Sequence, residues 1–268
     1  MRIAAAVLAL FTSIAAFGDG GDAANYELFL VPVTTDVISG ANGLQWTGEL
    51  ALYNGSQFGV TVVGSFADPR FLSPPGPLSV NVPPGKTVKP DLFASGMTVG
   101  AFLQVPRGFA SVLKKSLRAR DLSRNATSWG TDIPIVSTAE AGEHVTLIDI
   151  PTDPQYRAML RVYHWSGESG LPSRVTVYEE ASGQQIATFE LTSLAPDGAL
   201  APAEGELPLF PSYSQLDLLT PAVRAAGSTI RVHIDNMGGN VSPPLPPIWA
   251  FVSVTNNETQ QVTVMTPR

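Results

Sequence analysis

Alternating apolar and polar residues recur along most of this chain, and one such stretch appears twice. In residues 43–55, GLQWTGELALYNG, every second residue from Trp46 to Leu52 is aromatic, small or aliphatic. Successive side chains of a strand point to opposite faces, so these residues would share one face of a strand. About 110 residues later, residues 156–167, YRAMLRVYHWSG, repeat the order of aromatic, small and aliphatic residues. A strand of this kind buries one face and exposes the other, which is typical of antiparallel sheets.

Further short strands are expected around this repeated stretch, in the same order in both halves. In the first half they are residues 26–32, 60–62, 78–85, 100–105 and 109–113; in the second half they are residues 144–151, 175–177, 189–198, 228–234, 249–255 and 261–265. Turns containing Pro or Gly separate them, in keeping with 24 Gly and 23 Pro. Asp91 and Asp217 precede short apolar segments and are interpreted as N-cap or turn residues. This spacing predicts an all-β protein of two tandem immunoglobulin-like antiparallel β-sandwiches, with a β-helix or a jelly roll left open as alternatives.

The N-terminus indicates export. Arg2 is followed by an apolar run of about 15 residues and then by small residues, so residues 1–24 are interpreted as a signal peptide and short leader. The first sandwich is then expected over residues 25–139 and the second over residues 140–268, with the polar linker STAEAGE at the boundary. A Pro-rich insertion at residues 199–213 is expected to pack over a sandwich edge. We expect no membrane span in the mature chain and a secreted, periplasmic or cell-surface location.

Composition and net charge limit the classes of binding partner and of site that we expect. The net charge is −7, which disfavours nucleic acid and anionic lipid, because both are bound through clustered Lys and Arg. The absence of cysteine excludes disulfides, thiolate metal sites and cysteine nucleophiles. We expect a protein or a glycan of the cell envelope as the partner.

Five motifs of the chain form a pattern: Val31-Pro32, the strand Trp46 to Asn54, the turn Pro83-Pro84-Gly85, Asp91-Leu92-Phe93 and the closing Trp249 to Val254. Together they resemble a group of uncharacterised exported bacterial proteins that are built of tandem immunoglobulin-like β-sandwiches. The resemblance covers most of the mature chain. It implies the fold and export, and it implies no activity and no site residue.

No catalytic, metal or cofactor site is predicted. The chain has three histidines, His144, His164 and His233, and no G-x-S-x-G elbow for a serine nucleophile. His233 and Asp235 would share one face of a strand, but a transition-metal site needs three or four ligands. The polar strand end is therefore the preferred interpretation of this pair.

Two tryptophans are candidate binding residues. Trp129 and Trp165 fall in polar, Gly-rich turns, where an aromatic ring could stack on a sugar or, as is commoner, pack onto its own sandwich. Trp46 and Trp249 lie in apolar strands and are assigned to the core. The basic run at residues 114–124, KKSLRARDLSR, could bind an acidic polymer. The preferred interpretation is that these cations protect an exposed edge strand or loop from pairing with other strands.

These observations predict a non-catalytic exported binding or structural module that contacts protein or glycan through loops at the end of a sandwich. Two alternatives stay open. One is a carbohydrate-active or other hydrolytic enzyme whose carboxylates are assembled by the fold. The other is an architectural spacer in an envelope assembly.

Overall fold

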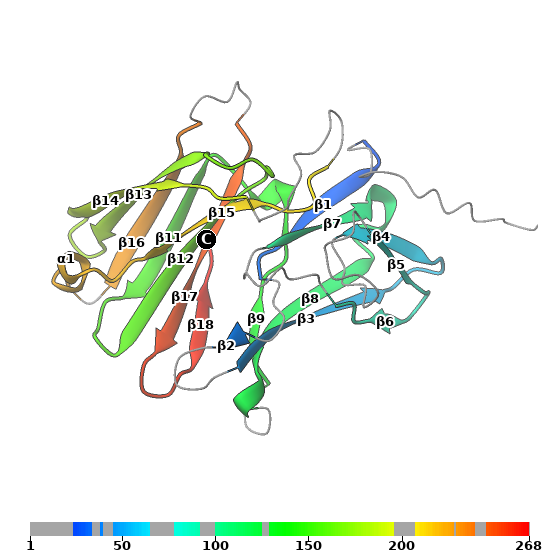
Figure 1. The fold of residues 1–268 in the computed structure, drawn as a ribbon, viewed down its shortest axis with the longest axis horizontal. Coiled ribbons are helices and arrows are strands. Elements are labelled where there is room, and N and C mark those ends of the chain that lie inside the picture. The colour runs from blue at the N-terminus through cyan, green and yellow to red at the C-terminus, as the bar shows by residue number, and fades with distance from the viewer. Residues whose placement is uncertain are drawn as a thin grey trace, which may run out of the picture.

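Figure 1 shows the computed structural model, which consists mainly of strands joined by short connections. It describes residues 24–33, 38–39, 45–64, 78–91, 100–124, 129–195, 207–227, 229–238 and 245–267. The predicted signal peptide and the first part of the Pro-rich insertion lie outside the described residues. No helix within the described ranges is long and apolar enough to cross a membrane.

The first half of the chain forms two antiparallel sheets. One has the strand order β10-β1-β7-β4-β5, and the other has the order β2-β3-β8-β9 with β6 also paired to β3. The strands are β1 (Tyr26–Val31), β2 (Ile38–Ser39), β3 (Gln45–Asn54), β4 (Val60–Gly64), β5 (Leu78–Val82), β6 (Thr87–Val88), β7 (Ala101–Pro106), β8 (Leu113–Asp121), β9 (Thr131–Ile133) and β10 (Val136–Ser137). Single 3-10 turns occupy Arg107–Phe109, Leu122–Arg124 and Thr138–Glu140.

The second half also forms two antiparallel sheets, ordered β11-β16-β13-β14 and β15-β12-β17-β18. The strands are β11 (His144–Pro151), β12 (Tyr156–His164), β13 (Pro172–Glu179), β14 (Gln185–Thr192), β15 (Ser212–Asp217), β16 (Thr229–Asn236), β17 (Ile248–Asn256) and β18 (Val262–Met265). The single turn of helix α1 (Pro221–Arg224) is capped by the Thr220 hydroxyl, and the nearby Asp217 carboxylate accepts a turn hydrogen bond from the Leu219 amide.

The two halves share one topology. The order β1-β7-β4-β5 in the first half corresponds to β11-β16-β13-β14 in the second, and β6-β3-β8-β9 corresponds to β15-β12-β17-β18. The predicted all-β fold of antiparallel sandwiches is confirmed. In the second half, β12 pairs with β15 and β13 with β16, as the second and fifth and the third and sixth strands of an immunoglobulin sandwich do. Among the seven strands β11 to β17, the first and the last lie in the opposite sheet from their counterparts in an immunoglobulin sandwich, because β11 pairs with β16 and β17 pairs with β12. The immunoglobulin-like assignment therefore stays a prediction.

The sheet that contains β12 and β17 is covered on both faces where the end of β12 lies beside the start of β17. Leu160, Val162 and Val252 point into the core of the second sandwich, whereas Tyr163 and Phe251 join the core cluster of the first sandwich. The sequence of β17, IWAFVSVTN, is apolar without interruption over its first five residues, as expected for a strand covered on both sides. The one wet face predicted for the repeated strand is therefore wrong at the end of β12, where the first sandwich covers Tyr163, and correct at its start, where Arg157 is exposed.

Hydrogen bonds fix the contact between the two sandwiches. The hydroxyl of the fully buried Tyr163 donates to the carbonyl of Pro32. Farther along, the amide of Phe102 on β7 donates to the carbonyl of Leu209, at 2.8 Å. Leu209 lies in the Pro-rich insertion, so the described part of that insertion bonds to β7 of the other sandwich at a residue that β4 does not pair.

The strand expected at residues 109–113 is also placed differently. β8 begins at Leu113 and continues to Asp121, so the basic run lies on the strand itself. β8 is paired with β3 along its whole length and with β9 at Leu117–Ala119, so it is a central strand and not an edge or a loop. The prediction failed because alternating Lys and Arg on the outer face hide the apolar inner positions, Leu113 and Leu117, from a search for apolar runs.

Candidate functional site

Trp129 lies on the surface directly before β9, with 71% of its area exposed. The following residue, Gly130, has φ +97°, and a Cβ atom there would lie 2.5 Å from the carbonyl oxygen of Ala119 and 2.9 Å from Cγ of Arg118. Only glycine tolerates both this backbone conformation and this close approach. Gly130 thus lets the chain pass tightly against β8 and places the Trp129 ring beside it.

Two arginines of β8 lie against that ring. The guanidinium carbons of Arg118 and Arg120 are 5.0 Å and 5.6 Å from its centroid. Both residues point to the outer face of the sheet, because residues two apart on a strand share a face. Each contact of this kind contributes about 0.5–1 kcal/mol at an exposed site. The arginines therefore hold the ring from the side of the sheet, and its high exposure leaves area for a ligand.

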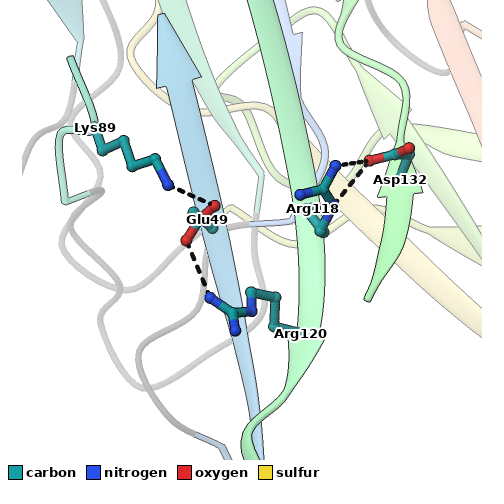
Figure 2. A network of polar contacts seen from close by, with 5 residues as sticks. All are labelled: Glu49, Lys89, Arg118, Arg120 and Asp132. Carbon is teal, nitrogen blue, oxygen red and sulfur yellow. Dashed lines mark hydrogen bonds and ion pairs between the residues drawn. The ribbon is translucent and has the colours of Figure 1, made fainter. Parts of the chain in front are cut away.

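Acidic side chains position the same arginines (Figure 2). Asp132 on β9 accepts from Arg118 Nη2 at 3.0 Å. Glu49 on β3 accepts from Lys89 Nζ at 3.0 Å and from Arg120 Nη1 at 3.3 Å. The hydrogen bond from Lys89, together with the charges of Lys89 and Arg120, lowers the pKa of Glu49 below its ordinary value, against a smaller opposing effect of burial. Glu49 therefore stays ionised and ties the two cations to one place.

The outer face continues along β8 beyond Arg118. Lys114 is exposed and lies opposite Tyr53, whose ring is 43% exposed. Lys114 and Arg120 are six residues apart on one strand, a separation of about 20 Å. Next to Glu49 lies a shallow hollow of about 270 Å³. We name the strip the arginine–tryptophan face; it comprises Tyr53, Lys89, Lys114, Arg118, Arg120 and Trp129 together with the acids Glu49 and Asp132. Its four cations exceed its two anions by two charges.

Not every cation of the basic run belongs to this face. Lys115 points inward, with its Nζ 3.7 Å from the ring centroid of Phe29 and hydrogen bonds to the carbonyls of Ala110 and Leu113. Burial lowers the pKa of the Lys115 ammonium group. Lys115 therefore has a structural role at the edge of the core.

Trp165 is not on the surface. Only 8% of its area is exposed, its ring packs 5.5 Å from that of Phe102, and its Nε1 donates to Thr138 Oγ1 at 3.1 Å. The prediction of a surface position for Trp165 is wrong, because the first sandwich covers the turn that carries it. Trp249, assigned to the core, is buried as well, within this contact between the sandwiches.

Two histidines and a carboxylate meet on the outer face of the second sandwich. His144 at the start of β11 is opposite Asp235 of β16, and their Nδ1 and Oδ1 atoms are 2.8 Å apart. Nε2 of His233 lies 3.1 Å from the same Oδ1 atom. Among the described residues this is the one group of three such side chains near enough to share a metal ion. Sequence analysis paired His233 with Asp235 and missed His144, since the register of β11 on β16 joins residues about 90 positions apart.

The third histidine is a core residue. His164 is fully buried, its Nε2 lies 3.0 Å from Ser173 Oγ, and burial lowers its pKa to about 4. This serine and histidine are near enough for a nucleophile–base pair, but both have no exposed surface. A substrate therefore has no access to them in this fold.

Comparison with known proteins identifies no family. No protein-family model and no curated protein matches the chain. Two solved structures align weakly, those of the Gt and Gx strains of infectious bursal disease virus, with 13% and 12% identity and TM-scores of 0.14 and 0.12. The alignments cover 91% and 93% of this chain, and 66% and 77% of the viral chains.

Proposed function

We propose that this protein is a non-catalytic binding module that holds an acidic polysaccharide on the arginine–tryptophan face. The observation that carries the proposal is the exposed ring of Trp129 held against two guanidinium groups. The free area of an aromatic ring suits the apolar face of a sugar, and guanidinium groups suit carboxylate or sulfate groups. The Trp129 ring and the two adjacent arginines offer both kinds of contact next to each other.

The shape and the charge of the face support a polymer as the ligand. An aromatic ring stands toward each end of the strip, Trp129 beside Arg120 and Tyr53 beside Lys114, so an extended chain can lie along β8. The whole protein carries a charge of −7, but fields at an exposed surface are screened within about 8 Å at physiological ionic strength. The two excess cations of the face therefore act locally on a bound polyanion.

We propose that the protein binds this ligand outside the cell. This part of the proposal is supported by the N-terminal signal-like sequence and by the resemblance to exported proteins with tandem immunoglobulin-like domains. Trp129 lies just before the start of β9, and the other residues of the face lie mainly along β3 and β8. We therefore propose contact along a sheet face and not through sandwich-end loops alone.

Binding to polygalacturonate, alginate and heparin, with dextran as a neutral control, tests the proposal. We expect at least one acidic polymer to bind, with affinity that falls as salt is raised, and Trp129→Ala to weaken binding about 10-fold, equivalent to about 1.4 kcal/mol. Phe58→Ala is the matched control, since Phe58 is also 71% exposed but lies in the turn between β3 and β4. Equal losses in the two variants would contradict the proposed face.

A further inference from the structure

The cluster of His144, His233 and Asp235 offers three ligand atoms, all within 4.8 Å of one another. In a tetrahedral zinc site with bonds of about 2.0–2.1 Å, ligand atoms are about 3.3 Å apart. The two separations from Asp235 Oδ1, 2.8 Å to His144 Nδ1 and 3.1 Å to His233 Nε2, are already close to that value. Small side-chain rotations would bring all three atoms onto one ion.

A second contact prepares His233 for this role. Its other ring nitrogen, Nδ1, lies 2.9 Å from Thr146 Oγ1. In the tautomer whose Nδ1–H donates to the hydroxyl, the lone pair of Nε2 points toward the carboxylate of Asp235, and a cation between the two would bind both. Metal-binding histidines are commonly held in this way by a partner on the second nitrogen.

The backbone fixes the geometry. Thr146 is opposite His233, and His144 is opposite Asp235, on the paired strands β11 and β16. The ligands therefore come from two adjacent strands of one sheet, and the rings of the two histidines stack with centroids 5.9 Å apart. All three histidines of the chain lie in the second half, so the first sandwich has no counterpart of this cluster.

The surrounding charge is compatible with a cation. Arg174 on β13 lies opposite Asp235, and its Nε donates to Glu190 at 2.9 Å, which offsets its charge. His144 is exposed, so water can complete the coordination of an ion.

We infer that His144, His233 and Asp235 form a surface site for one divalent transition-metal ion, of which Zn²⁺ is the representative. Two imidazoles and a carboxylate suit zinc and its neighbours better than Ca²⁺ or Mg²⁺, which prefer oxygen ligands throughout. The ion would join β11 to β16 and keep at least one position open to water.

Calorimetric titration of the untagged protein with ZnCl₂ tests the site. We expect one ion per chain, and an affinity at least about 10-fold weaker in His233→Ala and Asp235→Asn, with a loss of about 10-fold in Thr146→Ala. Glu258→Gln removes an exposed carboxylate from the turn between β17 and β18, away from the cluster, and is expected to bind Zn²⁺ like the wild type. Absence of zinc binding in the wild type, or unchanged binding in His233→Ala, would overturn the inference.

Nuclear magnetic resonance of the wild type keeps the test independent of how the variants fold. Zinc is expected to shift the ring signals of His144 and His233 and to leave those of the buried His164 in place. Shifts of His164 alone, or of no histidine, would also overturn the site.

Discussion

Substituting Tyr163 by Phe tests whether the contact between the two sandwiches stabilises the fold. The Tyr163 side chain is fully buried, and its hydroxyl donates to the Pro32 carbonyl of the other sandwich. Phenylalanine keeps the ring stacked on Phe251, 6.2 Å between centroids, but leaves a buried carbonyl without that donor. An unsatisfied buried group costs about 1–3 kcal/mol, so we expect the free energy of unfolding at pH 7 to fall by that amount.

The same substitution has an expected pH dependence. Burial raises the pKa of Tyr163 from 10.0 to about 12, so the folded state holds this proton more tightly than the unfolded state. The resulting stability is fully present below pH 10 and is lost as the pH rises through 12. At pH 11 the wild type has lost about 1 kcal/mol from this group, whereas the Phe variant loses nothing from it there. The stability difference between the two proteins is therefore expected to shrink by about 1 kcal/mol between pH 7 and pH 11.

Urea unfolding, followed by circular dichroism at both pH values, measures these differences. Tyr53→Phe is the control, because the Tyr53 ring is 43% exposed and a surface change of this kind stays within about 0.5 kcal/mol. Equal stability of Tyr163→Phe and wild type at pH 7 would refute the role given to the hydroxyl. A difference that does not change at pH 11 would refute the account of its burial.

Two further predictions concern His164 and Gly130. The lowered pKa of His164, about 4, means that the stability it contributes is present above pH 6.5 and is lost as the pH falls through 4. Urea unfolding at pH 7 and pH 4.5 should therefore show a loss of stability about 2 kcal/mol larger in the wild type than in His164→Gln, and parallel losses would contradict this expectation. Gly130→Ala should lower stability by about 1–3 kcal/mol in thermal unfolding, because its Cβ atom would collide with the Ala119 carbonyl. Gly85→Ala, also at positive φ but with open space around it, should cost less, and equal losses in the two variants would contradict the role of the close approach.

The sequence predicted strands correctly where the apolar residues of a strand lie on one face. The alternation from Trp46 to Leu52 predicted β3, and its repeat predicted β12, because each strand turns apolar residues toward the core of its own sandwich. Alternation says nothing about what covers the second face of a strand. Trp165 and Tyr163 were therefore not recognised as contacts between the sandwiches, although the uninterrupted apolar run in β17 was a signal for burial on both faces.

The candidate sites depend on strand register, that is, on which residues of two paired strands lie opposite each other. The composition of the chain does not encode this register. Trp129 was selected from the sequence as a polar-turn tryptophan, but its neighbours Arg118 and Arg120 were not assigned to it. Their contact requires β9 to pair with β8, and the cluster on β16 likewise requires β11 to pair there with His144 opposite Asp235. Pairing of this kind is set by the whole fold.

Quenching of tryptophan fluorescence by acrylamide tests the proposed binding face most directly. Trp129 is 71% exposed, Trp46 is partly buried, and Trp165 and Trp249 are 8% and 3% exposed, so Trp129 gives the signal most accessible to acrylamide. If an acidic polysaccharide lies on the arginine–tryptophan face, a saturating amount of the acidic polymer that binds will protect this signal in the wild type, and Trp129→Phe will show no such protection. A polymer that binds while Trp129 stays fully open to acrylamide would contradict the account.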